Sequence, residues 1–393
     1  MKRWLPEAFA VFAILAVVSY GFAQTWTMST PQVGVMYPGC AAMSADGMKI
    51  MVCGSSFGGG GIMAVSTNYG TAWTNIPYSA TLQYTWYHLA SSADVTKLLA
   101  ARVSVAGPIY VSTNSGNSWY PTFSPATNWS ALASSADGTK FYAVVNGGAI
   151  YCSTNSGMSW QSNNSPSNSW TSIAVSADGT KVYAASTNLI YGSTNSGRTW
   201  VPLSAPSIGW KSICSSADGT FLAAAGNFCY TSTNSGTSWT PTGQSFYLVA
   251  SSADGSKLIA STGIGYNVNG YIYLSTDYGN TWVSNSPPYN PWGYVGCSAD
   301  GNQFVAIVGS YYSAAYCWTL KNTPAPQLNV NASTNNCLLS WLVPSTNFVV
   351  QQSPDLISWS SFTNAPSLNP TNLNNELTIS PSNSSGFFRL ISQ

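Results

Sequence analysis

Two short motifs alternate along this chain, and their spacing restricts the fold more than any other feature. The first motif, Ser-Ala-Asp, occurs seven times at intervals of 36 to 48 residues. Its copies begin at Ser44, Ser92, Ser135, Ser176, Ser216, Ser252 and Ser298. A repeat of about 40 residues is typical of arrays in which each unit packs only against its neighbours. We therefore expect similar repeated units rather than unrelated domains.

The second motif has the form Ser-Thr-Asn/Asp-x-Gly-x-x-Trp and follows the first motif six times. Its copies begin at Ser66, Ser112, Ser153, Ser193, Ser232 and Ser275. Between the motifs lie short runs of β-type residues. The unit around the fourth Ser-Ala-Asp has predicted strands at 170–176, 181–185, 189–193 and 199–203. Four short antiparallel strands in each period predict a blade of a β-propeller.

The seventh unit lacks a final Trp strand and must obtain one from elsewhere. It has predicted strands at 294–298, 304–308 and 314–320, but no second motif follows. Residues 25–29 (Thr-Trp-Thr-Met-Ser) resemble residues 199–203, which end a complete unit. We therefore predict an all-β fold in which residues 24–321 form a seven-bladed β-propeller closed by the N-terminal strand. Closure would remove the open sheet edge that a linear array exposes.

The second motif resembles the Asp box, or bacterial neuraminidase repeat, in which Ser-x-Asp-x-Gly-x-Thr-Trp recurs around a propeller. The resemblance covers residues 24 to about 320. Families that share it include sialidases, xyloglucanase-type hydrolases, sortilin-type receptors and photosystem II stability/assembly factor-like proteins, so it implies a fold and no single function. This chain departs from the pattern, because five of its six boxes carry Asn and only Asp277 keeps the acid.

Both motifs are predicted to be turns. An Asn or Asp side chain can accept hydrogen bonds from turn amides, and the following Gly can adopt positive φ. The boxed Trp is expected to pack between blades. In Asp-box propellers these hairpins lie on one face and ligands meet the other. The resemblance therefore implies that function resides in the loops before each first strand and between the second and third strands.

An aromatic residue stands six positions before the Ser of the first motif in six of the seven units. These residues are Trp86, Trp129, Trp170, Trp210, Phe246 and Trp292. Each would lie where an inner strand begins, on the expected ligand face. Rigid aromatic side chains suit a platform on which sugar rings stack, so we take them as candidate ligand-binding residues. The alternative is that they pack between blades.

The charged residues exclude nucleic-acid binding and argue against hydrolysis. Only 6% of the residues are charged and the net charge is +1, whereas nucleic-acid binding requires a basic surface. Glycosidases need two carboxylates beside one bond. The acids of the predicted propeller are the seven turn Asp residues and Asp277, which leaves Asp355 and Glu376 beyond it. A sialidase would also need three arginines, and the predicted propeller has Arg102 and Arg198. We therefore predict no catalytic residue.

A single histidine, His88, limits the remaining chemistry. One histidine gives few options for a histidine-based metal site or a Ser-His-Asp triad. The Asp residues are too sparse to supply the clustered oxygen ligands that calcium requires. We predict no metal and no cofactor. Tyr87 precedes His88, and the predicted neighbouring strand carries Arg102 roughly opposite Tyr87. Such a cluster could serve a polysaccharide lyase, or His88 could be a hydrogen-bonded core residue.

The N-terminus is typical of an export signal. Lys2 and Arg3 precede an apolar run at 8–18, and Gly21 and Ala23 place small residues before a cleavage site. A membrane span needs about 20 apolar residues, so the run is too short to be one. We expect a signal peptide at 1–23 and a mature chain with no membrane span, located outside the cell, on its surface or in the periplasm.

Export permits disulfides among the eight cysteines. Cys40 and Cys53 flank the first turn of the first unit. A two-residue turn would pair them directly, whereas a bulged turn would shift the register by one residue. The spacing of the other cysteines does not match a disulfide framework, so we expect them to be small buried residues.

The repeats stop at a short Pro-containing linker at 322–326. Residues 327–393 alternate in β fashion over about six segments, which predicts a small β-sandwich. The pattern resembles short C-terminal modules of secreted bacterial proteins. A binding module, an attachment unit and a spacer are all compatible with it.

Three functions fit these observations. The first is an exported, non-catalytic protein that binds extracellular carbohydrate on the aromatic ring of six residues. The second is a carbohydrate-active enzyme, either a polysaccharide lyase or a sialidase- or glycosidase-like hydrolase. The third is a protein-interaction or assembly scaffold, with a protein rather than a glycan as partner.

Overall fold

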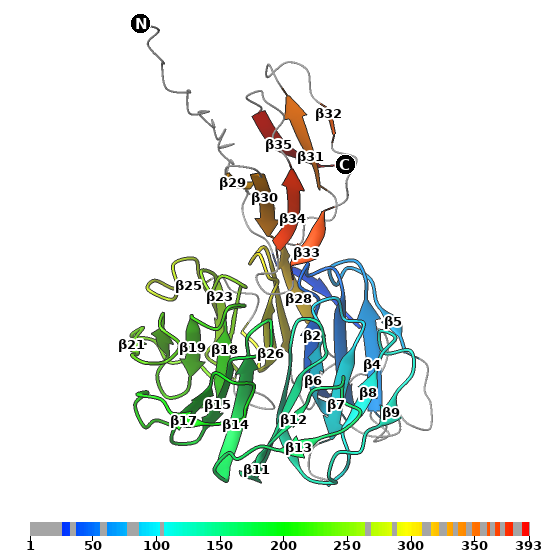
Figure 1. Cartoon of the computed structure of the whole chain (residues 1–393). Helices are drawn as coiled ribbons and strands as arrows, with labels where there is room; N and C mark the ends of the chain where they lie inside the picture. Colours follow the sequence, from blue (N-terminus) through cyan, green and yellow to red (C-terminus); the bar gives the residue numbers. More distant parts are fainter. Residues whose placement is uncertain are drawn as a thin grey trace, which may run out of the picture. The chain divides into compact units, whose positions relative to one another are not determined.

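The computed structural model of this chain consists of β-strands and connections (Figure 1). It describes residues 26–31, 37–55, 61–76, 86–102, 106–263, 269–284, 289–308, 316–321, 328–332, 337–342, 348–353, 360–361, 366–369, 374–379 and 387–392. No helix occurs in these segments, so none there could cross a membrane. The prediction of an all-β fold is confirmed. The chain divides into two compact units, one at 24–322 and the other mainly at 323–393.

Each repeat of the first unit contributes four antiparallel strands, which we call a sheet and number by its copy of Ser-Ala-Asp. Sheets 3 and 4 are also joined to each other, because Asn146 pairs with Ser169 and Gly148 with Asn168. Sheet 1 holds β2 (Tyr37–Met43), β3 (Ile50–Ser55), β4 (Gly61–Ser66) and β5 (Thr74–Asn75). Sheet 2 holds β6 (Trp86–Ser91), β7 (Leu98–Arg102), β8 (Tyr110–Ser112) and β9 (Tyr120–Pro121). Sheet 3 holds β10 (Trp129–Ser134), β11 (Phe141–Gly148), β12 (Ile150–Ser153) and β13 (Gln161–Ser162).

The next three sheets repeat this order. Sheet 4 holds β14 (Asn168–Val175), β15 (Val182–Ser186), β16 (Ile190–Ser193) and β17 (Val201–Pro202). Sheet 5 holds β18 (Ser212–Ser215), β19 (Leu222–Ala225), β20 (Tyr230–Ser232) and β21 (Thr240–Pro241). Sheet 6 holds β22 (Leu248–Ser251), β23 (Leu258–Ser261), β24 (Ile272–Ser275) and β25 (Val283–Ser284).

Sheet 7 contains β26 (Trp292–Cys297), β27 (Gln303–Val308) and β28 (Cys317–Lys321). Its fourth strand is β1 (Thr27–Ser29), which pairs with β28 in antiparallel register, Met28 opposite Trp318. The sequence placed residues 25–29 in this position. β1 includes 27–29, and residue 25 lies outside the described residues.

Neighbouring sheets meet along their first strands. Each first strand lies beside that of the next sheet, and β26 lies beside β2. The alanines of the first motif add a cycle of backbone hydrogen bonds in which each N–H donates to the next carbonyl. The cycle runs Ala45, Ala93, Ala136, Ala177, Ala217, Ala253, Ala299 and back to Ala45, with N–O distances of 2.7 to 2.8 Å.

Local hydrogen bonds explain both turns. In the first motif, Ser176 Oγ donates to Asp178 Oδ1 (2.6 Å), and Thr180 N–H donates to the same oxygen (2.9 Å). In the second motif, Thr199 N–H donates to Asn195 Oδ1 (2.9 Å) while Asn195 Nδ2 donates to Thr199 Oγ1 (2.8 Å). The turn requires one acceptor oxygen, which an amide supplies as well as a carboxylate does. This accounts for Asn in five boxes.

The fourth strands are shorter than predicted. The strand expected at 199–203 is β17, Val201–Pro202, and the fourth strands of sheets 2 and 5 also end in proline, at Pro121 and Pro241. Proline has no N–H to donate to a further partner, so these exposed edges resist pairing with another chain.

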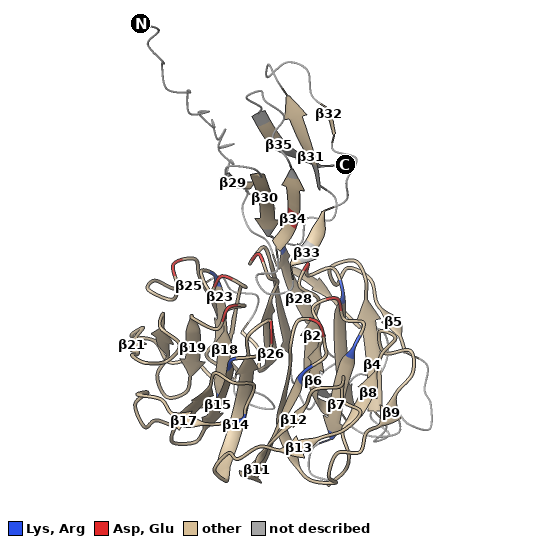
Figure 2. Cartoon of the chain, in the orientation of Figure 1, with Lys and Arg blue, Asp and Glu red and all other residues tan. Residues whose placement is uncertain are grey.

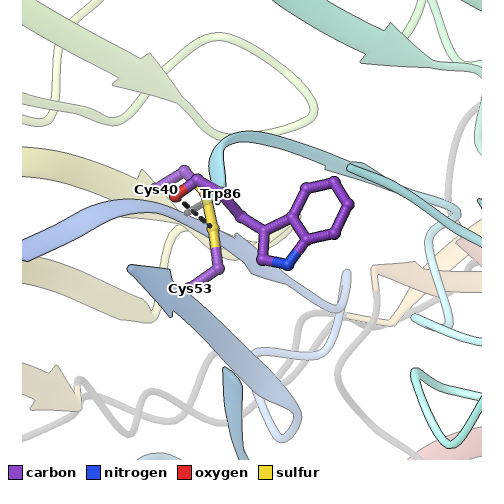
Figure 3. Close-up of a disulfide and its surroundings, with 3 residues drawn as sticks. All are labelled: Cys40, Cys53 and Trp86. Carbon is purple, nitrogen blue, oxygen red and sulfur yellow. Dashed lines mark hydrogen bonds between the residues drawn. A yellow bond between two sulfur atoms is a disulfide. The ribbon is translucent and has the colours of Figure 1, made fainter. Parts of the chain in front are cut away.

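Cys40 and Cys53 form a disulfide and are direct register partners on β2 and β3, with Cα atoms 5.5 Å apart (Figure 3). Cys53 Sγ lies 3.6 Å from the carbonyl oxygen of Trp86 on the next sheet. The direct pairing that a two-residue turn would give is the one found. Among the other described cysteines, none is in a disulfide.

The second unit has two sheets. One has the order β29 (Asn329–Ala332), β30 (Cys337–Leu342), β34 (Asn374–Ile379) and β33 (Ser367–Asn369). The other has β32 (Ser360–Ser361), β31 (Phe348–Ser353) and β35 (Phe387–Ser392). Its buried residues include Leu339, Trp341, Val350 and Leu377.

Candidate functional site

The six aromatic residues predicted to bind ligand lie in the core. Trp86, Trp129, Trp170, Trp210, Phe246 and Trp292 are each 0 to 2% exposed. A buried ring presents no face on which a sugar could stack, so the predicted platform is wrong and the packing alternative holds. The physical reason is aromatic pairing within sheets 2 to 6. Trp129, for example, meets Tyr151 edge to face with ring centroids 5.3 Å apart, and also contacts the boxed Trp160.

Three of these tryptophans also fix loops. Trp129 Nε1 donates to the Gly107 carbonyl (3.0 Å), Trp170 Nε1 to Gly148 (2.9 Å) and Trp292 Nε1 to Gly270 (2.8 Å). Each glycine precedes the third strand of the preceding sheet. Isolated β-bridges joining Gly107 to Thr127 and Gly270 to Asn290 lie beside two of these bonds. The tryptophans therefore position connections at one edge of the sheets.

Replacing Trp292 with Phe should release its loop while keeping a ring in the core. We expect the free energy of unfolding to fall by about 1–2 kcal/mol, because Gly270 loses a buried hydrogen bond. Amide exchange at Gly270 and Tyr271 should accelerate. Trp210→Phe is the matched control, because the buried Trp210 Nε1 has no hydrogen-bond partner. Equal losses of stability in the two variants would show that the indole hydrogen bond does not position the loop.

The two edges of the first unit differ in charge. We call the edge with the turns of both motifs the turn face. The opposite edge, with the connections from second to third strands and from fourth strands to the next sheet, is the loop face. Residues 24–321 contain eight Asp, no Glu and nine Lys or Arg. Every Asp lies in a turn of one motif, and Figure 2 shows acidic residues gathered at that edge of the sheets.

Only two cations of this segment belong to the loop face by their register. Arg102 pairs with Trp86 at the start of β6, and its guanidinium lies against Gly107. Lys211 stands just before β18 and is exposed. Of the remaining Lys and Arg residues, five follow turns of the first motif, Arg198 lies in a turn of the second, and Lys321 ends β28 opposite Gln303. The described part of the loop face therefore carries no carboxylate.

Large exposed aromatic residues mark the loop face instead. Phe123 is 90% exposed, and Phe228, Tyr271 and Tyr289 are 54%, 46% and 54% exposed. We call the last three, from sheet 5, sheet 6 and the entry to sheet 7, the aromatic arc. The rings of Tyr271 and Tyr289 pack together with centroids 4.9 Å apart.

Backbone contacts connect the supports of the aromatic arc. Lys211 N–H donates to the Ala225 carbonyl (2.8 Å), close in sequence to Phe228. The side chain of Ser245 donates through Oγ to the Asn227 carbonyl (2.5 Å), and Cys229 N–H donates to the Gln244 carbonyl (2.8 Å). These bonds join the Phe228 loop to the segment that enters sheet 6. The sequence missed the arc because its residues occupy different positions in their repeats.

The turn Asp residues are committed to their turns. Burial opposes ionisation of Asp178, but hydrogen bonds from Ser176 and Thr180 outweigh it, so its pKa is lowered. In Asp300, the effect of burial is larger than that of the hydrogen bonds, so the pKa of its carboxyl group is raised. Within the described segments, no group of three or more His, Cys, Asp or Glu residues is placed to hold a metal.

His88 is half-buried and its Nε2 lies inside the structure, so the lyase hypothesis gains no exposed imidazole nitrogen to act as the base. Its Nε2 is buried with no hydrogen-bond partner. Burial lowers its pKa to about 4, although the backbone of Trp129 partly opposes this shift. Tyr87 falls at a bulge, so Arg102 stands opposite Trp86 rather than Tyr87.

The depressed pKa of His88 predicts loss of stability in acid. The folded-state value of about 4 lies below the ordinary value of 6.5, so the unfolded chain binds the proton first. The stability that neutral His88 contributes should be fully present above pH 6.5 and should be lost as the pH falls toward 4. Between pH 7.5 and 5, His88→Leu should lose about 2 kcal/mol less than the wild type in urea denaturation. An identical pH profile for both proteins would contradict this.

Comparisons with known proteins identify the fold. No protein-family model and no curated protein matches the sequence. The structure of YCF48 bound to D1 peptide has a TM-score of 0.57 at 14% identity, covering 79% of this chain and 100% of that chain. YCF48 from Cyanidioschyzon merolae gives 0.56 at 14%, covering 76% and 98%. The β-propeller domain of Cps50 (Swd1) from Myceliophteria thermophila gives 0.58 at 14%, covering 77% and 100%. This likeness, together with the cyclic order of sheets, shows that the chain has a β-propeller fold.

Proposed function

We propose that this chain is an exported, non-catalytic protein-interaction module that binds a segment of a partner polypeptide on its loop face. The proposal includes a seven-bladed propeller closed by β1, Asp-box turns and a small C-terminal β-sandwich. The observation that carries it is the aromatic arc on a face whose described residues include no carboxylate.

Exposed aromatic side chains favour an interface over a solvent-facing role. Tyr and Phe are enriched in the centres of protein interfaces, where charged residues are depleted. Large exposed apolar patches on soluble proteins commonly mark interaction sites. The loop face also has rigid support, because the Trp292 indole and the Gly270–Asn290 bridge hold the segments that carry Tyr271 and Tyr289. A preformed surface lowers the entropy lost on binding.

The comparisons favour a polypeptide over a glycan. One of the similar propeller structures, YCF48, is bound to a peptide. The carbohydrate hypothesis rested on six rings that are buried. Catalysis has no support on the loop face, where the described residues offer neither a carboxylate nor an accessible histidine. Export agrees with the Cys40–Cys53 disulfide, since such bonds persist in oxidising compartments.

A peptide selection tests the proposal. Peptides selected from a random library on the purified full-length chain should bind it, and Phe228→Ser with Tyr289→Ser should weaken that binding at least tenfold. Met158→Ser is the matched control, because Met158 is 70% exposed but lies in a turn of the second motif. Selected peptides that bind both variants as tightly as the wild type would exclude the loop face. Circular dichroism checks that each variant remains folded.

A further inference from the structure

Lysines tie successive sheets together at the turn face. A Lys stands five residues after the Ser of the first motif in five of the seven repeats. In four of them its Nζ donates to the carbonyl of the next sheet's turn Asp. These bonds are Lys49 to Asp94 (3.1 Å), Lys97 to Asp137 (3.0 Å), Lys140 to Asp178 (2.9 Å) and Lys257 to Asp300 (2.9 Å).

At four of the five positions the lysine stem crosses the glycine of the next turn, whereas the turn after Lys49 has Val95 there. A Cβ added to Gly179 would lie 2.7 Å from Lys140 Cδ. Lys181 occupies the same position and donates to Ser235 Oγ (3.4 Å) on the next sheet. We call this arrangement the lysine latch. We call the interface between two neighbouring sheets a seam. The latch spans the seams between sheets 1 and 2, 2 and 3, 3 and 4, 4 and 5, and 6 and 7.

The other two seams have different residues at the latch position. Between sheets 5 and 6, Phe221 is buried and its ring lies 5.6 Å from that of Tyr278, so apolar packing replaces the lysine. Between sheets 7 and 1 the residue is Gln303, whose side chain lies against Gly47. Gln303 is 2% exposed, and neither its Oε1 nor its Nε2 has a hydrogen-bond partner. A buried amide without partners destabilises the packing around it.

An apolar cluster that includes Val52 and Ile307 packs across the interface between sheets 7 and 1, as a comparable cluster does at each other interface, so the difference lies in the polar contacts at the turn face. Trp73 Nε1 donates to Ser29 Oγ (3.0 Å), and Lys321 Nζ lies 3.9 Å from the centre of the Tyr69 ring. Ser29 belongs to β1, which pairs with β28 through three residues, whereas the other fourth strands pair through two. The alanine cycle crosses this seam with one backbone bond, from Ala299 N–H to the Ala45 carbonyl (2.8 Å).

We infer that the seam between sheets 7 and 1 is the weakest in the propeller and opens before the others. Proteins open locally where few interactions must break, and in a repeat array each interface contributes its own stability. The apolar clusters are comparable at all seams, so the seam with a buried, unpartnered amide at the latch position should have the highest open population. This opening does not depend on the proposed partner, which would bind the opposite face.

The alanine cycle supplies one reporter for each seam. Ala299 N–H crosses the seam between sheets 7 and 1, Ala136 N–H crosses that between sheets 3 and 4, and Ala217 N–H crosses that between sheets 5 and 6. Native-state hydrogen exchange of the full-length chain, read by NMR, measures the opening of each seam separately. We expect Ala299 to exchange fastest of the seven alanines, and Ala217 to exchange as slowly as alanines at latched seams.

Two substitutions exchange the chemistry of the seams. Gln303→Lys should place Nζ near the Asp46 carbonyl, as at the latched seams, and slow exchange at Ala299 about tenfold. Lys140→Gln removes the latch between sheets 3 and 4, where β11 and β14 remain paired, and should accelerate exchange at Ala136 by up to about tenfold. Slow exchange at Ala299 in the wild type would overturn the inference. So would an unchanged Ala299 in Gln303→Lys. If either variant fails to fold, the wild-type ranking and the other variant decide.

Discussion

Replacing Trp129 with Ala is expected to lower the free energy of unfolding by about 3–5 kcal/mol. The Trp129 ring is 2% exposed, packs on Tyr151 and Trp160, and donates a hydrogen bond to the Gly107 carbonyl. Its removal leaves a cavity between two sheets and frees a loop at the same time. Urea denaturation followed by far-ultraviolet circular dichroism measures the change.

Tyr120→Ala is the matched control for this loss. Tyr120 lies on the short edge strand β9 of the preceding sheet and is 63% exposed, so the expected change is within about 0.5 kcal/mol. A ligand platform would give a different result, because Trp129→Ala would then leave stability nearly unchanged and reduce only binding. That outcome would restore the carbohydrate hypothesis.

Removing the disulfide should have the second largest effect. Cys40→Ser with Cys53→Ser is expected to destabilise the chain by about 3 kcal/mol, because the unfolded state loses a covalent constraint between residues 13 apart. The bridge also lies beside the Trp86 carbonyl, so its loss loosens the contact between sheets 1 and 2. Thermal unfolding under oxidising conditions measures the difference.

A reduction experiment provides the control for the disulfide. Dithiothreitol should lower the midpoint of the wild type and leave the double serine variant unchanged, since no other described cysteine is in a disulfide. Equal sensitivity of the two proteins to the reductant would contradict the assignment.

The sequence was sufficient to predict the strands and the turns, because their determinants are local. Ser, Asp or Asn, and Gly recur at fixed offsets, and their hydrogen bonds lie within a few residues of each other. β1 was predicted on the same basis, since residues 25–29 repeat the composition of a fourth strand. The short outer strands were not, because the role of Pro202 as a strand end depends on which edge faces solvent.

The ring of six aromatic residues was misassigned because the sequence pattern of a strand does not show what a side chain packs against. A ring that packs on a neighbouring sheet and a ring that faces a ligand give the same pattern. A signal was nevertheless present within the repeats. The five units with an aromatic first strand and a second motif carry a Tyr two residues before that motif's Ser, at Tyr110, Tyr151, Tyr191, Tyr230 and Tyr273. Sheet 1 has Pro38 in place of the aromatic residue and Ala64 in place of Tyr. Paired occurrence and paired absence indicate that the two rings pack together.

The lysine latch and the aromatic arc escaped prediction for opposite reasons. The lysines are periodic, but their partners lie on the next sheet, and the contact depends on how the sheets are placed around the axis. The arc is not periodic. Phe228 and Tyr289 stand in connections of different length, so an alignment of the repeats does not bring them together, and their exposure is known only from the structure.

A parallel screen tests the central claim most directly. The purified full-length chain would be applied to a random peptide library and to an array of soluble and insoluble polysaccharides, with binding and released product read together. Our account predicts saturable binding of peptides that Tyr271→Ser with Tyr289→Ser abolishes, and neither binding nor product on any glycan. Saturable glycan binding, or product release, by a chain that selects no peptide would contradict it.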